Sequence, residues 1–261
     1  MKVAIFQCAA GGLDPTRRLA KLSAALDDPA GAAADLLVCP ELFMSGYNVG
    51  DALQRYAEPC NGPFAKAVAS LARGRGKAIL YGYPERDGTK LFNSAACFGS
   101  DGALLANHRK LVLPPGFESQ YFDRGDTLTF LSLGGVKFAL LVCYDAEFPE
   151  TVRAVARRGV HAVIAPTALK DNWNSVATRL IPTRAFENGI YMIYANHAGS
   201  EGDAHYLGAS CIIGPDGEDV ARAGSGEEVV AASLDLDAVK RARARLPYLE
   251  DVSQLSAVAT S

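Results

Sequence analysis

Cys143 is the residue in this sequence best placed to act as a nucleophile. It ends the apolar run 138–142 and is followed by Tyr144 and, further on, by Pro149, where a helix is expected to begin. A cysteine at a strand-to-helix junction lies near backbone N–H groups, which lower a thiol pKa and bind an oxyanion. A lone cysteine at the end of an apolar strand is more often a buried structural thiol. Other residues must therefore decide between these two interpretations.

Two charged residues stand at similar boundaries. Glu41 stops the apolar run 36–40, and Lys110 separates the polar pair 108–109 from the apolar run 111–113. A charged side chain directly after a buried strand often lies in a cleft at the end of that strand. The alternatives are a solvated or helix-capping glutamate and an ordinary surface lysine. Taken singly, neither residue identifies a site.

Taken together, three short blocks are informative. The sequence reads Cys-Pro-Glu-Leu-Phe over 39–43, His-Arg-Lys-Leu over 108–111 and Cys-Tyr-Asp-Ala-Glu-Phe-Pro-Glu over 143–150. In order and spacing these blocks resemble the three signatures of the nitrilase (carbon-nitrogen hydrolase) superfamily. The resemblance covers nearly the whole chain and includes the segments 5–7, 46–48, 122–126, 184–188, 195–196 and 214–217. It favours a catalytic Cys143 over a structural one.

The resemblance implies a Glu-Lys-Cys constellation made of Glu41, Lys110 and Cys143. In such a site the thiolate attacks an amide carbonyl and Glu41 moves the proton. Lys110, with the backbone N–H of Tyr144, would hold the tetrahedral oxyanion. Glu118 occupies the place of a second active-site glutamate and is expected to have a positioning and electrostatic role. The alternative for Glu118 is a simple loop carboxylate.

Within the superfamily, the chain most resembles bacterial 5-aminopentanamidases and related aliphatic amidases. That resemblance rests on the segments 38–50, 81–86, 194–196, 212–217 and 246–251. It implies hydrolysis of a small linear amide, 5-aminopentanamide first, through a cysteine thioester. The run 110–115 and His197 depart from the pattern and leave open a nitrilase, an ω-amidase, an N-carbamoyl amidohydrolase or a stereoselective amidase. A non-catalytic binding homologue is disfavoured, because all three residues of the constellation are present.

Glu147 stands where many members of the superfamily have arginine. A carboxylate at this position could attract the ω-ammonium of an amino-amide. The alternative is that Glu147 caps the following helix or pairs with an arginine such as Arg153.

Four further residues are candidates for the pocket wall. Tyr47 and Trp173 could form part of it, although both aromatic types commonly pack in cores. Thr167 and Ala168 directly follow an apolar strand on the same side as the site. We expect their backbone to contact the substrate.

The elements that must hold these residues in place alternate along the chain. Apolar, β-branched runs predict strands at 3–6, 36–39, 78–81, 94–98, 138–142, 162–165, 190–194, 209–213 and 229–234. Helical patterns cover about 15–27, 62–74, 149–158 and 173–188. Alternation of this kind predicts a layered α/β fold in a single domain spanning 1–261. The resemblance refines this to a four-layer αββα sandwich that pairs into a homodimer or a larger homo-oligomer.

Composition narrows the possible partners. The 261 residues are 49% hydrophobic and carry a net charge of −3 without basic blocks, so nothing favours nucleic acid or a membrane surface. The six cysteines are spread singly, and no export signal is expected, which together predict a cytoplasmic protein. The four histidines have no metal-ligand spacing, so we expect neither a metal nor another cofactor.

Overall fold

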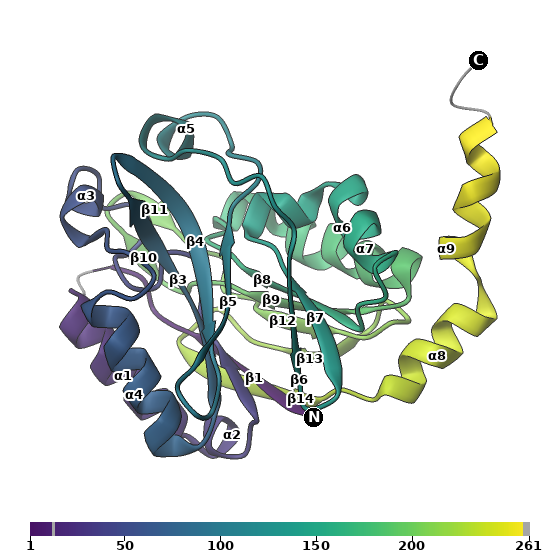
Figure 1. The fold of residues 1–261 in the computed structure, drawn as a ribbon, viewed down its shortest axis with the longest axis horizontal. Coiled ribbons are helices and arrows are strands. Elements are labelled where there is room, and N and C mark those ends of the chain that lie inside the picture. Colours follow the sequence, from purple (N-terminus) through teal and green to yellow (C-terminus); the bar gives the residue numbers. More distant parts are fainter. Residues whose placement is uncertain (12–13, 258–261) are drawn as a thin grey trace.

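The computed structural model describes residues 1–11 and 14–257, which form two sheets packed face to face with helices outside (Figure 1). One sheet has the order β14 (Glu228–Ser233), β1 (Lys2–Gln7), β2 (Leu36–Val38), β3 (Ala78–Asp87), β4 (Lys90–Phe98) and β5 (Leu104–Arg109). The other has the order β13 (Asp219–Arg222), β12 (Cys211–Ile213), β9 (Tyr191–Ala195), β8 (Ala162–Pro166), β7 (Val136–Leu140) and β6 (Thr129–Leu133). This arrangement confirms the predicted four-layer α/β sandwich.

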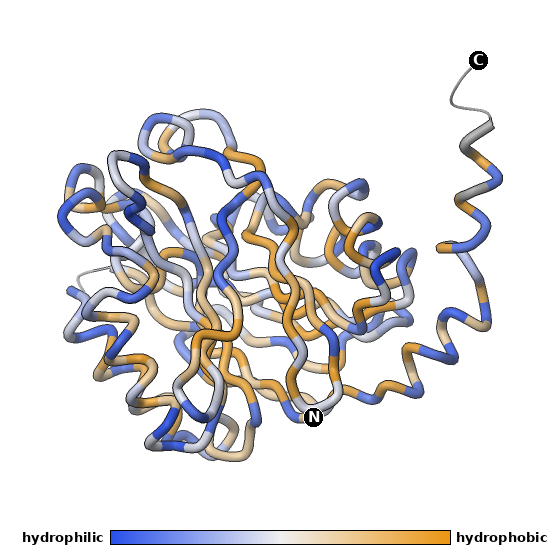
Figure 2. Tube along the Cα trace, in the orientation of Figure 1, coloured by the Kyte–Doolittle hydropathy of each residue, from blue (hydrophilic) through white to orange (hydrophobic). Residues whose placement is uncertain are grey.

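Alternation along the central strands explains why the sheets stack. Val3 and Ile5 of β1 face the core shared by the two sheets, whereas Ala4 and Phe6 face the helices on the other side. Successive side chains of a strand point to opposite faces, so a strand that is apolar throughout is buried on both. Figure 2 shows apolar residues following the strands through the middle of the molecule. The shared core lies between the sheets, directly beneath the site described below.

Each sheet is covered by a pair of helices. α1 (Pro15–Asp27) and α4 (Pro63–Arg75) pack on the first sheet, and α6 (Pro149–Ala156) and α7 (Ile181–Asn188) on the second. The remaining helices are α2 (Pro29–Ala32), α3 (Ala52–Tyr56), α5 (Phe117–Tyr121), α8 (Leu236–Arg245) and α9 (Tyr248–Asp251). In Figure 1 α8 and α9 run away from the layered body. No helix in the described ranges is both long and apolar enough to cross a membrane.

The helical pattern predicted over about 173–188 is confirmed, but the type of helix changes along the segment. A 3-10 turn covers Asp171–Trp173, a π-helix covers Val176–Leu180, and only then does α7 begin. Pro182 lies in the first turn of α7 and has no N–H to donate to the carbonyl four residues earlier, which favours a change of helix type just before it.

Several elements were missed, and the bounds of some predicted strands differ from those observed. β5, β6, β13, α8 and the hairpin of β10 (Ser200–Glu201) with β11 (Ala204–His205) were not foreseen. β5 carries Asn107, His108 and Arg109, so it lacks the apolar run that signals a strand. The predicted strand 138–142 ends at Leu140, which frees the next two residues to lead into the nucleophile turn.

Strand direction determines where the polar residues meet. β1, β2 and β3 are parallel in the first sheet, as are β7, β8 and β9 in the second. The carboxyl ends of parallel strands collect at one edge of a sheet, where α/β proteins commonly bind ligands. Glu41 lies shortly after β2, Cys143 shortly after β7 and Thr167 directly after β8.

Candidate active site

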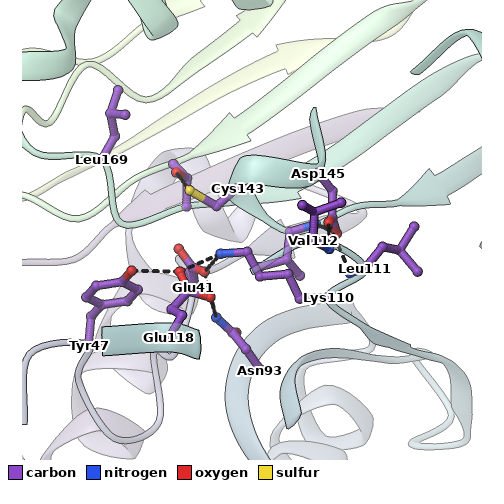
Figure 3. Close-up of polar contacts among 12 residues, drawn as sticks. Glu41, Tyr47, Asn93, Lys110, Leu111, Val112, Glu118, Cys143, Asp145 and Leu169 are labelled. Atoms are coloured by element: carbon purple, nitrogen blue, oxygen red, sulfur yellow. Dashed lines mark hydrogen bonds and ion pairs between the residues drawn. The ribbon is translucent and has the colours of Figure 1, made fainter. Parts of the chain in front are cut away.

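Glu41, Lys110, Glu118 and Cys143 come from four separate segments and meet between the two sheets (Figure 3). Lys110 directly follows β5, Glu118 lies in α5, and Cys143 opens the 3-10 turn Cys143–Glu147. The sequence resemblance placed these residues in one site, and the structure brings them together.

Lys110 is held between two carboxylates. Its Nζ lies 2.7 Å from Glu41 Oε1 and 2.6 Å from Glu118 Oε1, and the three side chains are buried. Burial by itself would lower the pKa of Lys110, but the nearby Glu41, Cys143 and Glu118 raise it above its usual value. Lys110 is therefore a fixed cation. An ammonium has three N–H groups, so one is left for another acceptor.

Asn93 joins the same two carboxylates and was not predicted. Its Nδ2 donates to Glu41 Oε1 at 2.7 Å and to Glu118 Oε2 at 3.0 Å. The pairing of β4 with β5 brings it there, since Lys110 N donates to Asn93 O at 2.8 Å. Tyr47 OH adds a hydrogen bond to Glu118 Oε1 at 2.7 Å. The one feature of the sequence that could have predicted this role is that Asn93 is a polar residue within an apolar strand.

Glu41 has one carboxylate oxygen left for chemistry. Oε1 accepts from Lys110 and Asn93, whereas the buried Oε2 has no hydrogen-bond partner among the described residues. Burial raises the pKa of Glu41 to about 7, since it outweighs the opposite influence of Lys110. A carboxylate with this pKa can both take and return a proton near neutral pH.

His197 supports the backbone at Glu41 and is not an acid or base. Its Nε2 lies 2.7 Å from the carbonyl oxygen of Glu41, so this nitrogen carries the hydrogen. Burial and the charge of Arg18 lower the pKa of His197 to about 3. The ring is neutral at working pH and holds the turn that presents Glu41.

Cys143 sits on a strained turn at the edge of the pocket. Its φ of +46° is uncommon for any residue other than glycine and is a conformation found at functional sites. The sulfur lies 3.0 Å from Thr167 Oγ1. Burial and the charge of Glu41 raise the pKa of the Cys143 thiol well above its usual value. The resting thiol is protonated and needs a base in order to react.

Asp145, two residues after Cys143, ties the nucleophile turn to the lysine segment. One carboxylate oxygen accepts from the backbone N–H groups of Leu111 at 3.0 Å and Val112 at 2.9 Å. The other accepts from Val142 N at 3.1 Å and lies 3.3 Å from His108 Nε2. No sequence pattern predicts this role of Asp145, because each contact crosses from one sheet to the other or closes a local turn.

A cavity of about 630 Å³ opens onto Cys143. It is lined by Tyr47, Pro114, Pro115, Phe117, Glu118, Cys143, Tyr144, Glu147, Ala168, Leu169, Lys170, Trp173 and Val176. Of the ten residues predicted for the site, seven line this cavity. The others, Glu41, Lys110 and Thr167, are buried just behind its wall.

Neither alternative for Glu147 is seen in the structure. The helix α6 has no side-chain cap, and Arg153 pairs with Glu187 at 3.7 Å. Within the described chain the Glu147 carboxylate has no hydrogen bond or ion pair, although Arg184 holds the Glu147 carbonyl at 2.7 Å. Burial raises the pKa of Glu147. The Glu147 carboxylate lines the cavity, and none of the described residues pairs with it.

The rest of the wall was missed because its residues carry no chemical signature. Phe117, Leu169 and Val176 give the cavity an apolar side, and Lys170 places a cation at its rim. Trp173, by contrast, is 58% exposed and therefore not a core residue. In the part of the chain that the structure describes, no cluster of three or more His, Cys, Asp or Glu could hold a metal ion.

Comparison with known proteins identifies the family. Residues 2–244 match the carbon-nitrogen hydrolase family. A Pseudomonas protegens protein named "Hydrolase in pqqF 5'region" is 40% identical over 96% of this chain and 88% of its own. An (R)-stereoselective amidase of Pseudomonas sp. is 34% identical over 96% of this chain and 91% of its own.

A solved structure of an amidase is also similar to this chain. The amidase from Nesterenkonia sp. AN1 superposes with a TM-score of 0.85 at 35% identity, over 94% of this chain and 98% of that one. That structure is described as showing Michael addition of acrylamide at the active site cysteine. Another structure of the same amidase, with a TM-score of 0.81 at 34% identity over 94% and 95% of the chains, is described as a complex with butyramide. The chain therefore belongs to the carbon-nitrogen hydrolase family and is a hydrolase of carbon-nitrogen bonds.

Proposed function

We propose that this protein is an amidase that converts a small linear amide to the carboxylate and ammonia, with Cys143 as nucleophile. The observation that carries the proposal is a lysine clamped between two buried carboxylates beside a cysteine at the end of an open cavity. The Nesterenkonia amidase, similar along nearly its whole length, has been solved with acrylamide and butyramide, and both are small amides.

In the first half of the reaction the thiol is activated and acylated. Glu41, through its unpaired Oε2, takes the proton from Cys143 as the sulfur attacks the amide carbon. The developing oxyanion accepts from the remaining N–H of Lys110 and from the backbone N–H of Tyr144. The proton held by Glu41 passes to the nitrogen, ammonia leaves, and a thioester on Cys143 remains.

In the second half water replaces ammonia. Glu41, now a carboxylate again, takes a proton from the water that attacks the thioester. The C–S bond breaks, the carboxylic acid is released, and the proton returns to the sulfur. Glu118 keeps Lys110 in place through both halves, because it shares that cation and Asn93 with Glu41.

The cavity favours a linear aliphatic chain that ends in a cation. Phe117, Leu169 and Val176 provide apolar contact, and Glu147 is an unpaired carboxylate on the same wall. A half-buried carboxylate without a partner is a good acceptor for an ammonium group. We therefore assign 5-aminopentanamide as the first substrate to test, with Glu147 receiving its ω-ammonium.

Ammonia release from a substrate panel tests this assignment. The panel contains 5-aminopentanamide, pentanamide, a dicarboxylic monoamide, an N-carbamoyl amine and a nitrile, with Cys143→Ala as the control. Preference for 5-aminopentanamide that is lost in the variant is the expected result. Turnover that survives Cys143→Ala would overturn the mechanism. A Cys143-dependent preference for another compound would overturn the assignment of 5-aminopentanamide as substrate.

Glu147→Gln tests the ammonium contact directly. The change keeps the shape of the side chain and removes its charge, so KM for 5-aminopentanamide should rise about tenfold while KM for pentanamide stays unchanged. Glu150→Gln is the matched control, since Glu150 is exposed three residues later. Equal losses on both amides would exclude the contact.

Lys170 supports one alternative substrate class. It lines the rim of the same cavity and could pair with the free carboxylate of a dicarboxylic monoamide, the substrate type of an ω-amidase. If the monoamide is preferred in the panel, Lys170→Met should weaken its binding and leave pentanamide unaffected.

We also propose a cytoplasmic homodimer or larger homo-oligomer. All six cysteines are free, which suits a reducing compartment. Apolar residues are exposed on and beside the C-terminal helices, among them Leu246 and Tyr248. Sedimentation velocity at micromolar concentration should give at least twice the monomer mass of 27.6 kDa. A monomer under these conditions would contradict the proposal.

A further inference from the structure

Three neighbouring strands of one sheet bring a hydroxyl chain to the nucleophile. Cys143 follows β7, Thr167 follows β8, and Tyr194 lies in β9. Thr167 Oγ1 is 3.0 Å from Cys143 Sγ and also 3.0 Å from Tyr194 OH. Thr167 and Tyr194 are both fully buried. The parallel pairing of β8 with β9 fixes the spacing, because Ala165 is opposite Tyr194.

Counting protons gives the chain a direction. A threonine hydroxyl has one hydrogen, so it can donate to the sulfur or to the tyrosine, but not to both. If Thr167 donated to Tyr194, the buried tyrosine proton would have no acceptor among the described residues. A buried donor left without a partner destabilises the folded state. The satisfied arrangement therefore runs from Tyr194 O–H to Thr167 Oγ1, and from Thr167 O–H to the sulfur.

We propose that Tyr194 and Thr167 form a hydrogen-bond relay that stabilises the thiolate of Cys143. Thr167 touches the reacting sulfur and is a catalytic residue, whereas Tyr194 acts through Thr167 and is a positioning residue. The inference rests on the proposed function only in taking Cys143 as the nucleophile. The inference goes beyond the proposed function by naming the hydrogen-bond donors that stabilise negative charge on the sulfur. They act as the thiol loses its proton and again when the thioester breaks.

The relay stabilises the thiolate with a neutral donor, which the charged groups around the sulfur cannot do. The charges of Glu41 and Glu118 disfavour a thiolate at Cys143, while Lys110 favours it but is shared with these two carboxylates. Tyr47 is a further buried hydroxyl in the site, and it donates to Glu118. The Thr167 hydroxyl is neutral, so it stabilises the anion without adding a charge that would bind the carboxylates. Its own donor, Tyr194, polarises it further.

The test measures the sulfur directly and needs no physiological substrate. Modification of Cys143 by iodoacetamide is followed by peptide mass spectrometry between pH 6 and 10, which separates it from the other five cysteines. Thr167→Val removes the hydroxyl at nearly constant shape and should slow the modification about tenfold at each pH in this range, because a less stabilised thiolate makes up a smaller fraction of the sulfur. Thr167→Ser, which restores a hydroxyl, should return the modification rate to the wild-type value across the same pH range.

Tyr194→Phe distinguishes a relay from a single contact. Alone, Tyr194→Phe should slow the modification about twofold to fivefold. In the Thr167→Val background it should not slow the modification further, because its effect passes through Thr167. Circular dichroism and thermal melting check that each variant is folded. An unchanged modification rate in folded Thr167→Val, or an equal effect of Tyr194→Phe in both backgrounds, would overturn the relay. Failure of the amide panel would leave this measurement intact.

Discussion

Glu41 shows how burial and pairing give one carboxyl group its chemistry. Two donors hold Oε1 and leave Oε2 open, and the pKa rises to about 7 because burial outweighs the nearby lysine. The same residue in water would titrate near 4.5, too low for it to keep a proton for the departing ammonia. The reactive property therefore belongs to the position as much as to the residue type.

A pH prediction follows for the reaction rate. The carboxylate form of Glu41 is the one that accepts the thiol proton, so kcat/KM should rise with pH through about 7 and fall below it. Glu41→Gln should lower kcat/KM by about 10² to 10⁴ and remove this acidic limb. Stopped assays of ammonia release across pH 5–9 give both results, with the exposed Glu218→Gln as the control. An unchanged limb in Glu41→Gln would assign the titration to another group.

At the scale of elements, the turn after β2 can approach β3 only because Gly82 has no side chain. Gly82 N donates to Pro40 O at 3.2 Å, and Met44 N donates to Gly82 O at 3.1 Å. A Cβ on Gly82 would lie 2.4 Å from Leu42 N and 2.8 Å from Glu41 Cα, both of them backbone atoms. The close approach of this turn to the strand is what aims Glu41 at the cavity.

Gly82→Ala should therefore disturb the site more than the fold. The turn must shift to accept the methyl group, and a displacement of about 1 Å at a reacting group can cost about a hundredfold in rate. The matched control is Gly74→Ala in α4, where the added Cβ meets nothing within 4 Å and alanine should stabilise the helix by about 0.5–1 kcal/mol. Kinetics and thermal melting of both variants check this. Wild-type kinetics in Gly82→Ala would contradict it.

At the scale of the whole molecule, the active site exists only where the two sheets are docked. Lys110 directly follows β5 of the first sheet and Cys143 follows β7 of the second, and a shared apolar core joins the two sheets. Asp145 links the two sheets through hydrogen bonds. Its carboxylate accepts from the backbone N–H groups of Leu111 and Val112 after β5 and of Val142 after β7. Its carboxylate is fully buried.

Removing the Asp145 carboxylate should lower both the stability and the activity of the protein. Asp145→Ala leaves one buried and two partly buried N–H groups without their acceptor, for a loss of about 3 kcal/mol in the free energy of unfolding. Urea unfolding and kcat/KM measured on the same preparation should both fall, whereas the exposed Asp126→Ala should match the wild type. Unchanged stability in Asp145→Ala would show that the sheets dock without it.

The three residues that identify the family, and much of the framework that holds them, could be predicted without a structure. Glu41, Lys110 and Cys143 were found because short blocks preserve them in order, and α1 was predicted with its observed bounds because Pro15 opens an amphipathic run. Local signals of this kind depend on neighbours in the chain. They are therefore readable without a structure.

Tertiary structure alone decided how those residues are tuned. Asn93 lies 52 positions from Glu41, Lys110 lies 69 positions from Glu41, and Thr167 lies 24 positions from Cys143. Such contacts arise from strand register and from the docking of two sheets, neither of which leaves a pattern in a single sequence. The pKa of Glu41, its open oxygen and the hydroxyl chain behind Cys143 are consequences of that packing.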